Sequence, residues 1–165
     1  MKAYQLVQTI SPELQKEIVT HMATQHKAAF RMVMNTLAAT RKLRPVFLQK
    51  KSRDGQQAWL LEQLRIRTNE GVAEQVVQLW LLKGQQGMLK AFLDAVGIDH
   101  KEGEVETLPE EISEEQGKAG ITALLAEVPG EKAAVYLHMF QMQRPGGWEG
   151  LAKAIAAEPT LKLGE

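Results

Sequence analysis

Apolar side chains recur at spacings of three and four residues along most of this chain, which is the period of an α-helix. The clearest helix start is Ser11-Pro12, because a hydroxyl side chain can cap the helix and the fixed φ of proline suits its first position. The apolar stripe that follows predicts helix over residues 12–41, either continuous or broken near residues 20–25. Its members include Leu14, Ile18, Val19, Met22, Val33 and Leu37.

Later segments repeat this period. Residues 69–82 are apolar on nearly all sides, which indicates a central, buried helix that contains Trp80. Gly97 followed by Ile98 is typical of a helix end with glycine in the left-handed conformation, so we expect a positive φ at Gly97. Ser113 with Gln116 fits a capping box that begins a helix ending near Glu127. Shorter helices are expected around residues 59–64, 88–96, 135–140 and 148–157.

The pattern therefore predicts an all-α fold, a compact bundle of about six to eight helices. Only short pieces such as "AYQLV" alternate in the manner of a strand. The length favours one domain over residues 1–165. The alternative is two small lobes, residues 11–98 and 109–158, joined by an acidic linker over residues 99–108.

Composition narrows the class of protein. The chain has 20 basic and 20 acidic residues, so it lacks the basic excess that is usual in dedicated nucleic-acid binders. It has no cysteine, which excludes disulfides, thiolate metal sites and cysteine nucleophiles. No long apolar run or signal-peptide pattern occurs, so we expect a cytoplasmic protein with no membrane partner.

One strongly basic stretch, "RKLRPVFLQKKSR" over residues 41–53, interrupts this balance. Pro45 disfavours helical geometry at Arg44, so we expect an inter-helix connection with Phe47 packed inward and the cations solvated. An anion or nucleic-acid contact, or docking of an acidic partner, are the alternatives. The candidate contact residues are Arg41, Lys42, Arg44, Lys50, Lys51 and Arg53.

A strongly acidic stretch, residues 99–115, carries eight carboxylates and one lysine. Its negative excess matches the positive excess of residues 41–67, which also include Arg65 and Arg67. The two stretches could face each other within one molecule or across a dimer, and a solvated acidic linker is the simpler interpretation. Exposed ion pairs contribute at most about 1 kcal/mol each, so such pairing would orient the surfaces more than stabilise them.

Catalytic and metal-binding motifs are missing from the sequence. His21 and His26 are five residues apart, which does not place them on one helix face, and His138 adjoins an apolar stripe. Asp99, His100 and the nearby glutamates match no zinc or calcium spacing. The chain has no nucleophile elbow and no phosphate-binding glycine loop. We therefore predict no catalytic residue, metal or cofactor.

Three stretches, "RKLRPVFLQKK", "LWLLKGQQGMLKAFLDAVGIDH" and "AAVYLHMF", resemble a family of small, uncharacterised bacterial proteins that are entirely helical. The resemblance extends from about Ser11 to Trp148. It implies a compact, helical, cytoplasmic bacterial protein, and it implies no activity, cofactor or catalytic residue.

Two hypotheses of function follow, with an enzyme of unrecognised type as a third. The favoured one is a non-enzymatic helical protein that acts through protein–protein contacts, with a partner or with itself. The alternative is a small nucleic-acid-associated protein that uses residues 41–53. Cations that converge on one exposed face favour nucleic acid, whereas scattered or internally paired cations favour the first hypothesis.

Overall fold

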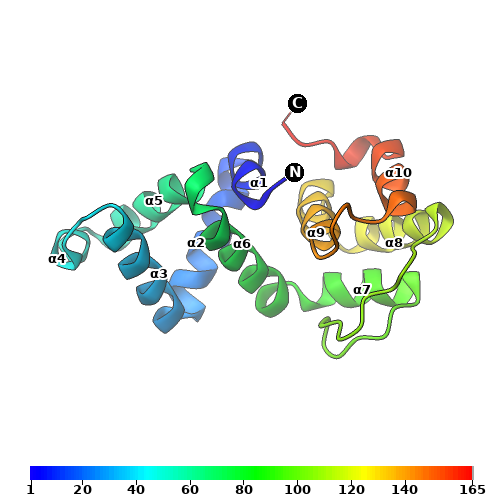
Figure 1. Cartoon of the computed structure of the whole chain (residues 1–165), viewed down its shortest axis with the longest axis horizontal. Coiled ribbons are helices and arrows are strands. Elements are labelled where there is room, and N and C mark those ends of the chain that lie inside the picture. Colours follow the sequence, from blue (N-terminus) through cyan, green and yellow to red (C-terminus); the bar gives the residue numbers. More distant parts are fainter. Residues whose placement is uncertain (165) are drawn as a thin grey trace. The chain divides into compact units, whose positions relative to one another are not determined.

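The computed structural model describes residues 1–164 as an all-α protein with ten α-helices (Figure 1). Helix makes up 73% of the chain and no strand is present in the described residues, which confirms the predicted fold class. The predicted number of helices, six to eight, is too low. Two short helices account for much of the difference, α1 (Ala3–Thr9) and α4 (Pro45–Gln49).

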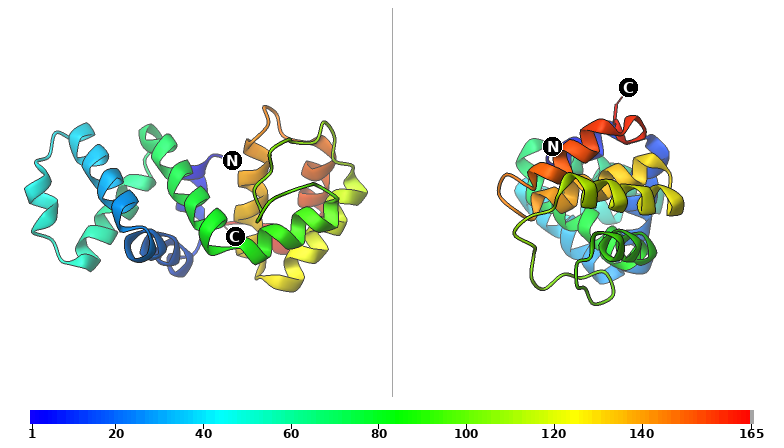
Figure 2. Two further views of the ribbon diagram at one scale, coloured as in Figure 1. Left: turned by 90° about the horizontal axis from the view of Figure 1, so that it is seen from below. Right: turned by 90° about the vertical axis from the view of Figure 1, so that its right-hand side faces the viewer.

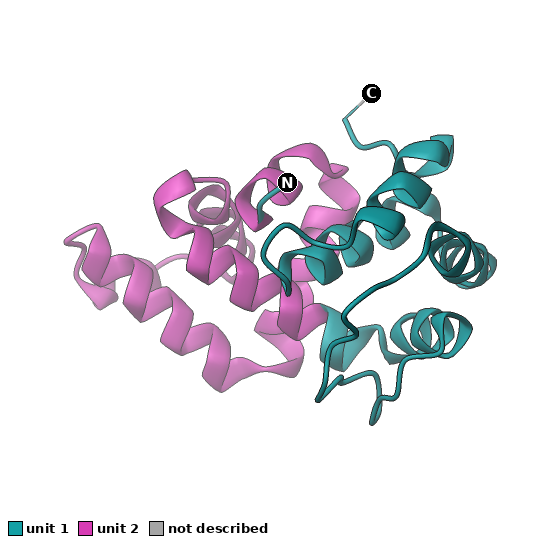
Figure 3. Cartoon of the chain, turned by 45° about the vertical axis from the view of Figure 1, so that its right-hand side comes forward, with its two compact units in different colours: residues 1–2, 81–165 teal, residues 3–80 magenta. Residues whose placement is uncertain are grey.

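The chain divides into two compact units (Figure 3). One unit comprises Ala3–Trp80, and the other comprises residues 1–2 together with the chain from Leu81 onward. The chain passes from one to the other within a π-helical turn, Trp80–Gly84. The acidic segment 99–108, expected between two lobes, lies inside the second unit.

In the first unit, the helix expected over residues 12–41 is two helices, α2 (Pro12–Gln25) and α3 (Lys27–Thr40). The break is at His26, whose φ of −135° and ψ of 58° are not helical. The predicted start is confirmed, because the Ser11 hydroxyl accepts a hydrogen bond from the Leu14 N–H, with Pro12 in the first helical position.

Three more helical elements complete this unit, namely α5 (Arg53–Leu64), a 3₁₀ turn (Arg67–Asn69) and α6 (Glu70–Leu79). The Glu70 carboxylate accepts hydrogen bonds from the backbone N–H groups of Ala3 and Tyr4, each at 2.9 Å. These are two of the N–H groups that the first turn of α1 leaves without helical partners. A residue 67 positions away thus caps α1, which explains why local sequence gave no start signal for this helix.

The second unit contains four α-helices and a terminal 3₁₀ turn. They are α7 (Gln86–Val96), α8 (Glu114–Glu127), α9 (Gly130–Met142), α10 (Glu149–Ala157) and the turn Pro159–Leu161. Gly97 ends α7 with a φ of 83°, and Ser113 and Gln116 form the capping box of α8. Both predictions are confirmed.

Two glycines let α8 pack closely against the helices on either side of it. A Cβ at Gly120 would lie 2.6 Å from the Phe92 ring of α7, and one at Gly117 would lie 2.9 Å from the Ala154 Cβ of α10. The Phe92 ring also makes edge contacts with Tyr136 and Phe140 of α9, both at 5.3 Å between centroids. An aromatic core thereby joins α7, α8 and α9.

Trp80 is predicted to be a major contributor to stability, because only 1% of its surface is exposed. We expect Trp80→Ala to lower the free energy of unfolding by about 3–5 kcal/mol, the usual cost of truncating a large buried aromatic. Urea denaturation followed by circular dichroism measures this loss. Trp59→Ala, which removes a less buried tryptophan of α5, is the matched control and should cost clearly less. Equal losses would contradict the prediction.

Gly97 allows a second, independent test. A Cβ would meet no atom within 4 Å at Gly97 or at Gly87, but only Gly97 has a positive φ. Gly97→Ala should therefore cost about 1–2 kcal/mol through backbone strain alone. Gly87→Ala, within α7, should cost nothing, because alanine suits a helix better than glycine. Thermal melts of the two variants compare them, and a Gly97 variant as stable as the wild type would refute the argument.

Candidate functional site

α4 is a single helical turn at the end of the first unit, between α3 and α5 (Figure 2). Arg44 precedes it in the extended conformation (φ −73°, ψ 136°), as expected for a residue before proline. Pro45 is then the first helical residue, where its fixed φ and missing N–H cause no loss. Pro45 therefore keeps Arg44 out of helical geometry, as predicted, and itself begins the short helix α4.

The three apolar residues of α4 point in different directions. Leu48 is 4% exposed, whereas Val46 is 50% exposed and Phe47 is 52% exposed. The prediction that Phe47 packs inward is therefore wrong. Consecutive residues of an α-helix are rotated by about 100°, so a single turn cannot direct all three toward the same core. Leu48 occupies the inward position and leaves Val46 and Phe47 in solvent.

Polar contacts fix the backbone that carries these side chains. The Gln56 side-chain amide donates to the Leu48 carbonyl at 3.1 Å and to the Lys51 carbonyl at 3.4 Å. The Ser52 hydroxyl accepts from the Gly55 N–H at 3.0 Å and caps α5. Beside α4 a cavity of about 330 Å³ is lined by Phe30 and Met34 of α3 together with Leu48. The exposed residues thus stand on an ordered base.

Cationic residues lie on both sides of Val46 and Phe47 in the sequence, and most of them are exposed as well. We call residues 44–53 the basic tip; its cations are Arg44, Lys50, Lys51 and Arg53. All are exposed except Lys51, which is half-buried. The Lys51 ammonium lies over the Phe47 ring, 5.3 Å from its centroid, so this lysine is held against the exposed aromatic.

The other two candidate residues lie before the tip, and one is directed elsewhere. The Arg41 Nε donates to the Gln63 Oε1 at 2.9 Å. Gln63 is ten residues along α5 from Arg53, a distance of about 15 Å at the helical rise. Lys42 is exposed and has a φ of 56°, the left-handed conformation. The six cations are therefore spread over the end of the unit and do not form one tight cluster.

No ion pair within 4.0 Å involves the four tip cations, Arg41 or Lys42 in residues 1–164. The nearest acid in sequence is Asp54, in the first turn of α5. Because no acid of residues 1–164 pairs with them to offset their charge, these exposed cations give the tip a local positive potential. Hydrogen bonding and charge attraction are the chemistry it offers, beside the apolar surface of Val46 and Phe47.

A second surface feature is the loop between α7 and α8, which contains the acidic stretch. His100 joins the loop to α7, since its Nε2 lies 2.7 Å from the Asp94 Oδ1 and its Nδ1 accepts from the Gly103 N–H at 3.1 Å. The part of the loop nearer α8 is held by the Trp148 indole N–H, which donates to the Pro109 carbonyl at 2.9 Å. The segment read as a solvated linker is thus an anchored loop.

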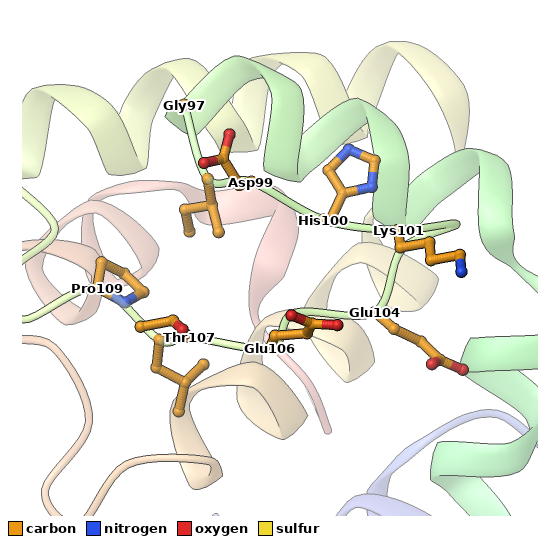
Figure 4. A pocket seen from close by; sticks show the side chains of 10 residues that line it. Gly97, Asp99, His100, Lys101, Glu104, Glu106, Thr107 and Pro109 are labelled. Carbon is orange, nitrogen blue, oxygen red and sulfur yellow. The ribbon is translucent and has the colours of Figure 1, made fainter.

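This loop encloses a groove of about 560 Å³, which we call the acidic groove. Its lining residues are Gly97, Ile98, Asp99, His100, Lys101, Glu104, Glu106, Thr107, Leu108 and Pro109. In Figure 4, Asp99 and His100 lie on one arm and Glu106, Thr107 and Pro109 on the other. Ile98, Leu108 and Pro109 add apolar surface to the lining. Asp99 and Glu106 are exposed, and neither forms an ion pair in the described part of the chain.

Lysines of the second unit already neutralise other acids of the loop. The Lys83 Nζ lies 3.8 Å from the Glu104 Oε1, and the Lys90 Nζ lies 3.0 Å from the Glu102 Oε2. The sequence analysis compared the acidic residues 99–115 with the basic residues 41–67. It did not predict these two ion pairs, because Lys83 and Lys90 lie outside both stretches. Five acids of residues 99–115 form no ion pair in residues 1–164, namely Asp99, Glu106, Glu110, Glu111 and Glu115, and of these Asp99 and Glu106 line the groove.

Metal ligands do not gather anywhere in residues 1–164 in a group of three or more. The His21 and His26 rings lie 4.9 Å apart at the junction of α2 and α3, without further ligands. No helix in this part of the chain is long and apolar enough to cross a membrane. Both the basic tip and the acidic groove combine exposed charged side chains with apolar surface.

Comparisons of the chain with protein-family models, with curated proteins and with solved structures find no match. The resemblance to a family of bacterial helical proteins therefore stays a prediction. Any function has to be argued from the residues and geometry described above.

Histidine protonation is predicted to make the fold less stable in acid. Burial lowers the pKa of His21, and the nearby His26 lowers it further, although Glu17 opposes the shift. Burial also lowers the pKa of His138, with a smaller contribution from the N-terminal amino group. The unfolded chain, with histidine pKa values near 6.5, then binds these protons first.

Stability should therefore be complete above about pH 6.5 and fall as the pH decreases below it. Urea denaturation at about pH 7.5 and about pH 5 measures the fall, and the double variant His21→Gln, His138→Gln should show a smaller one. The variant His100→Gln is the control for a histidine outside this pair. A double variant with the same pH dependence as the wild type would contradict the assignment.

Proposed function

We propose that this chain is a non-enzymatic binding protein that acts through protein–protein contacts and docks an acidic segment of its partner at the basic tip. One observation carries the proposal: Val46 and Phe47 are half exposed on an ordered helical turn, among cations that have no ion-pair partner in residues 1–164. A side chain as large as phenylalanine gains free energy when a partner covers it.

The two parts of the tip have different roles in such a contact. The apolar pair supplies affinity, because removing its area from water is favourable and interface energy concentrates in a few buried side chains. The cations supply orientation and speed of association, since charge complementarity steers encounter more than it adds affinity. The cavity beside Leu48 offers room for an apolar side chain of the partner.

Two features favour a protein partner over a nucleic acid. The Lys51 ammonium covers one face of the Phe47 ring, the surface on which a base would stack. Arg41 is directed to Gln63, about 15 Å along α5 from Arg53, so the cations do not form a single phosphate-binding row. The zero net charge points in the same direction.

The side chains of the tip favour binding over catalysis. Ser52, the hydroxyl of this segment, is occupied as the cap of α5. Asp54 is the carboxylate nearest to it in sequence, and no histidine lies in residues 27–99. A nucleophile with an adjacent base, which covalent catalysis requires, has no candidates here.

The proposal is tested with a labelled peptide of alternating glutamate and leucine, titrated with the protein and followed by fluorescence anisotropy. We expect binding at about 0.1 M salt that weakens at about 1 M, where charges are screened over shorter distances. Phe47→Ala should weaken it about tenfold, the effect of losing one central interface side chain. Lys50→Ala, Lys51→Ala and Arg53→Ala together should weaken it at low salt and change it little at high salt.

Matched control variants remove the same kinds of side chain, one exposed apolar residue or three exposed cations, from positions outside the tip. Met32→Ala deletes an apolar side chain that is 70% exposed on α3, and should leave binding unchanged. The triple change of Lys16, Lys27 and Arg67 to Ala removes the same charge from exposed positions outside the tip that also form no ion pair in residues 1–164. A peptide with lysine in place of glutamate should not bind. Stronger binding of a single-stranded oligonucleotide than of the acidic peptide, lost in the tip triple variant, would replace this proposal with the nucleic-acid alternative.

A further inference from the structure

The basic tip presents an unusual combination for which a partner surface can be specified. It projects two adjacent apolar side chains, half exposed, and the exposed cations Lys50 and Arg53 follow them within six residues. A complementary surface must be concave, apolar inside and acidic at its edge, because cations left without a counter-charge in a contact lose solvation without compensation. The acidic groove of this same chain has these properties.

The groove matches the tip in size and chemistry, and its lining carries the carboxylates Asp99, Glu104 and Glu106 against one lysine, Lys101. Its volume of about 560 Å³ lies within the usual range of binding pockets, so it can admit an apolar side chain. Ile98, Leu108 and Pro109 give it apolar surface, and Asp99 and Glu106 stand exposed on its two arms (Figure 4). Asp99 and Glu106, which have no ion-pair partner in residues 1–164, can therefore pair with Lys50 and Arg53, which also have none.

The anchoring of both surfaces lowers the cost of joining them. Leu48 and the Gln56 amide hold the tip, while the His100–Asp94 contact and the Trp148–Pro109 hydrogen bond hold the groove. Surfaces that are already ordered lose less conformational entropy when they associate. Their fit therefore does not depend on a change in either loop.

We infer that the partner of the basic tip is a second copy of this chain, whose acidic groove receives Val46 and Phe47 while Lys50 and Arg53 meet Asp99 and Glu106. The inference rests on the proposed function, since it names the partner of the same tip. The contact is heterologous, because two different surfaces of the copies meet. A chain with one tip and one groove then forms either a closed ring or a growing chain of copies.

The oligomeric state tests this inference. A contact of this small size is expected to be weak, so sedimentation velocity is measured from about 10 µM to about 1 mM. We expect the weight-average mass to rise with concentration at about 0.1 M salt and to return to that of the monomer at about 1 M. A single mass of 18.4 kDa at every concentration and both salts would overturn the inference.

Charge reversal identifies the two surfaces. The tip variant is Lys50→Glu, Arg53→Glu, and the groove variant is Asp99→Lys, Glu106→Lys; circular dichroism confirms that each is folded. Each variant alone should be monomeric. Mixed in equal amounts they should associate again, because the wild-type tip of the groove variant meets the wild-type groove of the tip variant, and the reversed tip meets the reversed groove with opposite charge. The mixture should therefore gain mass with concentration as the wild type does, with the two variants alternating. The variant with all four changes should self-associate again, because the charges are exchanged.

The outcomes separate this inference from the proposed function. Self-association that survives in both single-surface variants would place the contact elsewhere and refute the inference. A chain that binds the acidic peptide through Phe47 but remains monomeric would refute the inference alone and retain the proposed function. A control variant, Lys16→Glu with Lys27→Glu, should associate like the wild type, so loss in that variant would also refute the assignment to the tip.

Discussion

The burial of Leu48 is the constraint on which the candidate site depends. A helix of one turn has a single inward position, and Leu48 fills it while its neighbours Val46 and Phe47 remain in water. The Gln56 side-chain amide donates a hydrogen bond to the Leu48 carbonyl and so joins this turn to α5. Exposure of the apolar pair is therefore a consequence of how the turn is anchored, and it is maintained by the fold.

Charge is organised differently in the two units. Several acids of the second unit have local partners, such as Lys118 for Glu114 and Lys153 for Glu149, one helical turn apart, whereas Asp99 and Glu106 at the groove have none in residues 1–164. The cations of the basic tip have no such partners, although the Lys51 ammonium lies over the Phe47 ring. A zero net charge thus conceals a local positive surface, and this local surface is what a partner meets.

Close helix packing limits what can vary in the second unit. Side chains on Gly117 or Gly120 would collide with α10 or α7, and the Phe92 ring occupies the space that Gly120 leaves. The acidic loop begins at the end of α7 and ends at the start of α8, so the packing of these two helices sets the distance between its ends. The loop that forms the groove is therefore tied at both ends to closely packed helices.

Local signals in the sequence determined the helical class and several boundaries. Ser11-Pro12, Gly97 and the Ser113–Gln116 pair act through bonds to residues three to five positions away, so their effect is legible without tertiary structure. Long-range contacts decided the rest. The start of α1 depends on Glu70, which is distant in the sequence. The break at His26 could not be predicted from a local signal, because no proline or glycine lies there.

The candidate site shows the same division. The sequence identified the six cations and the three apolar residues between them, because residue types are known from the sequence alone. It did not identify which apolar residue is buried, since that depends on the direction in which α3 and α5 approach α4. It also placed the acidic stretch in a linker, whereas contacts of His100 and Trp148 with the loop make it a groove. Charge and period are properties of the chain, but exposure and concavity arise only when distant segments pack together.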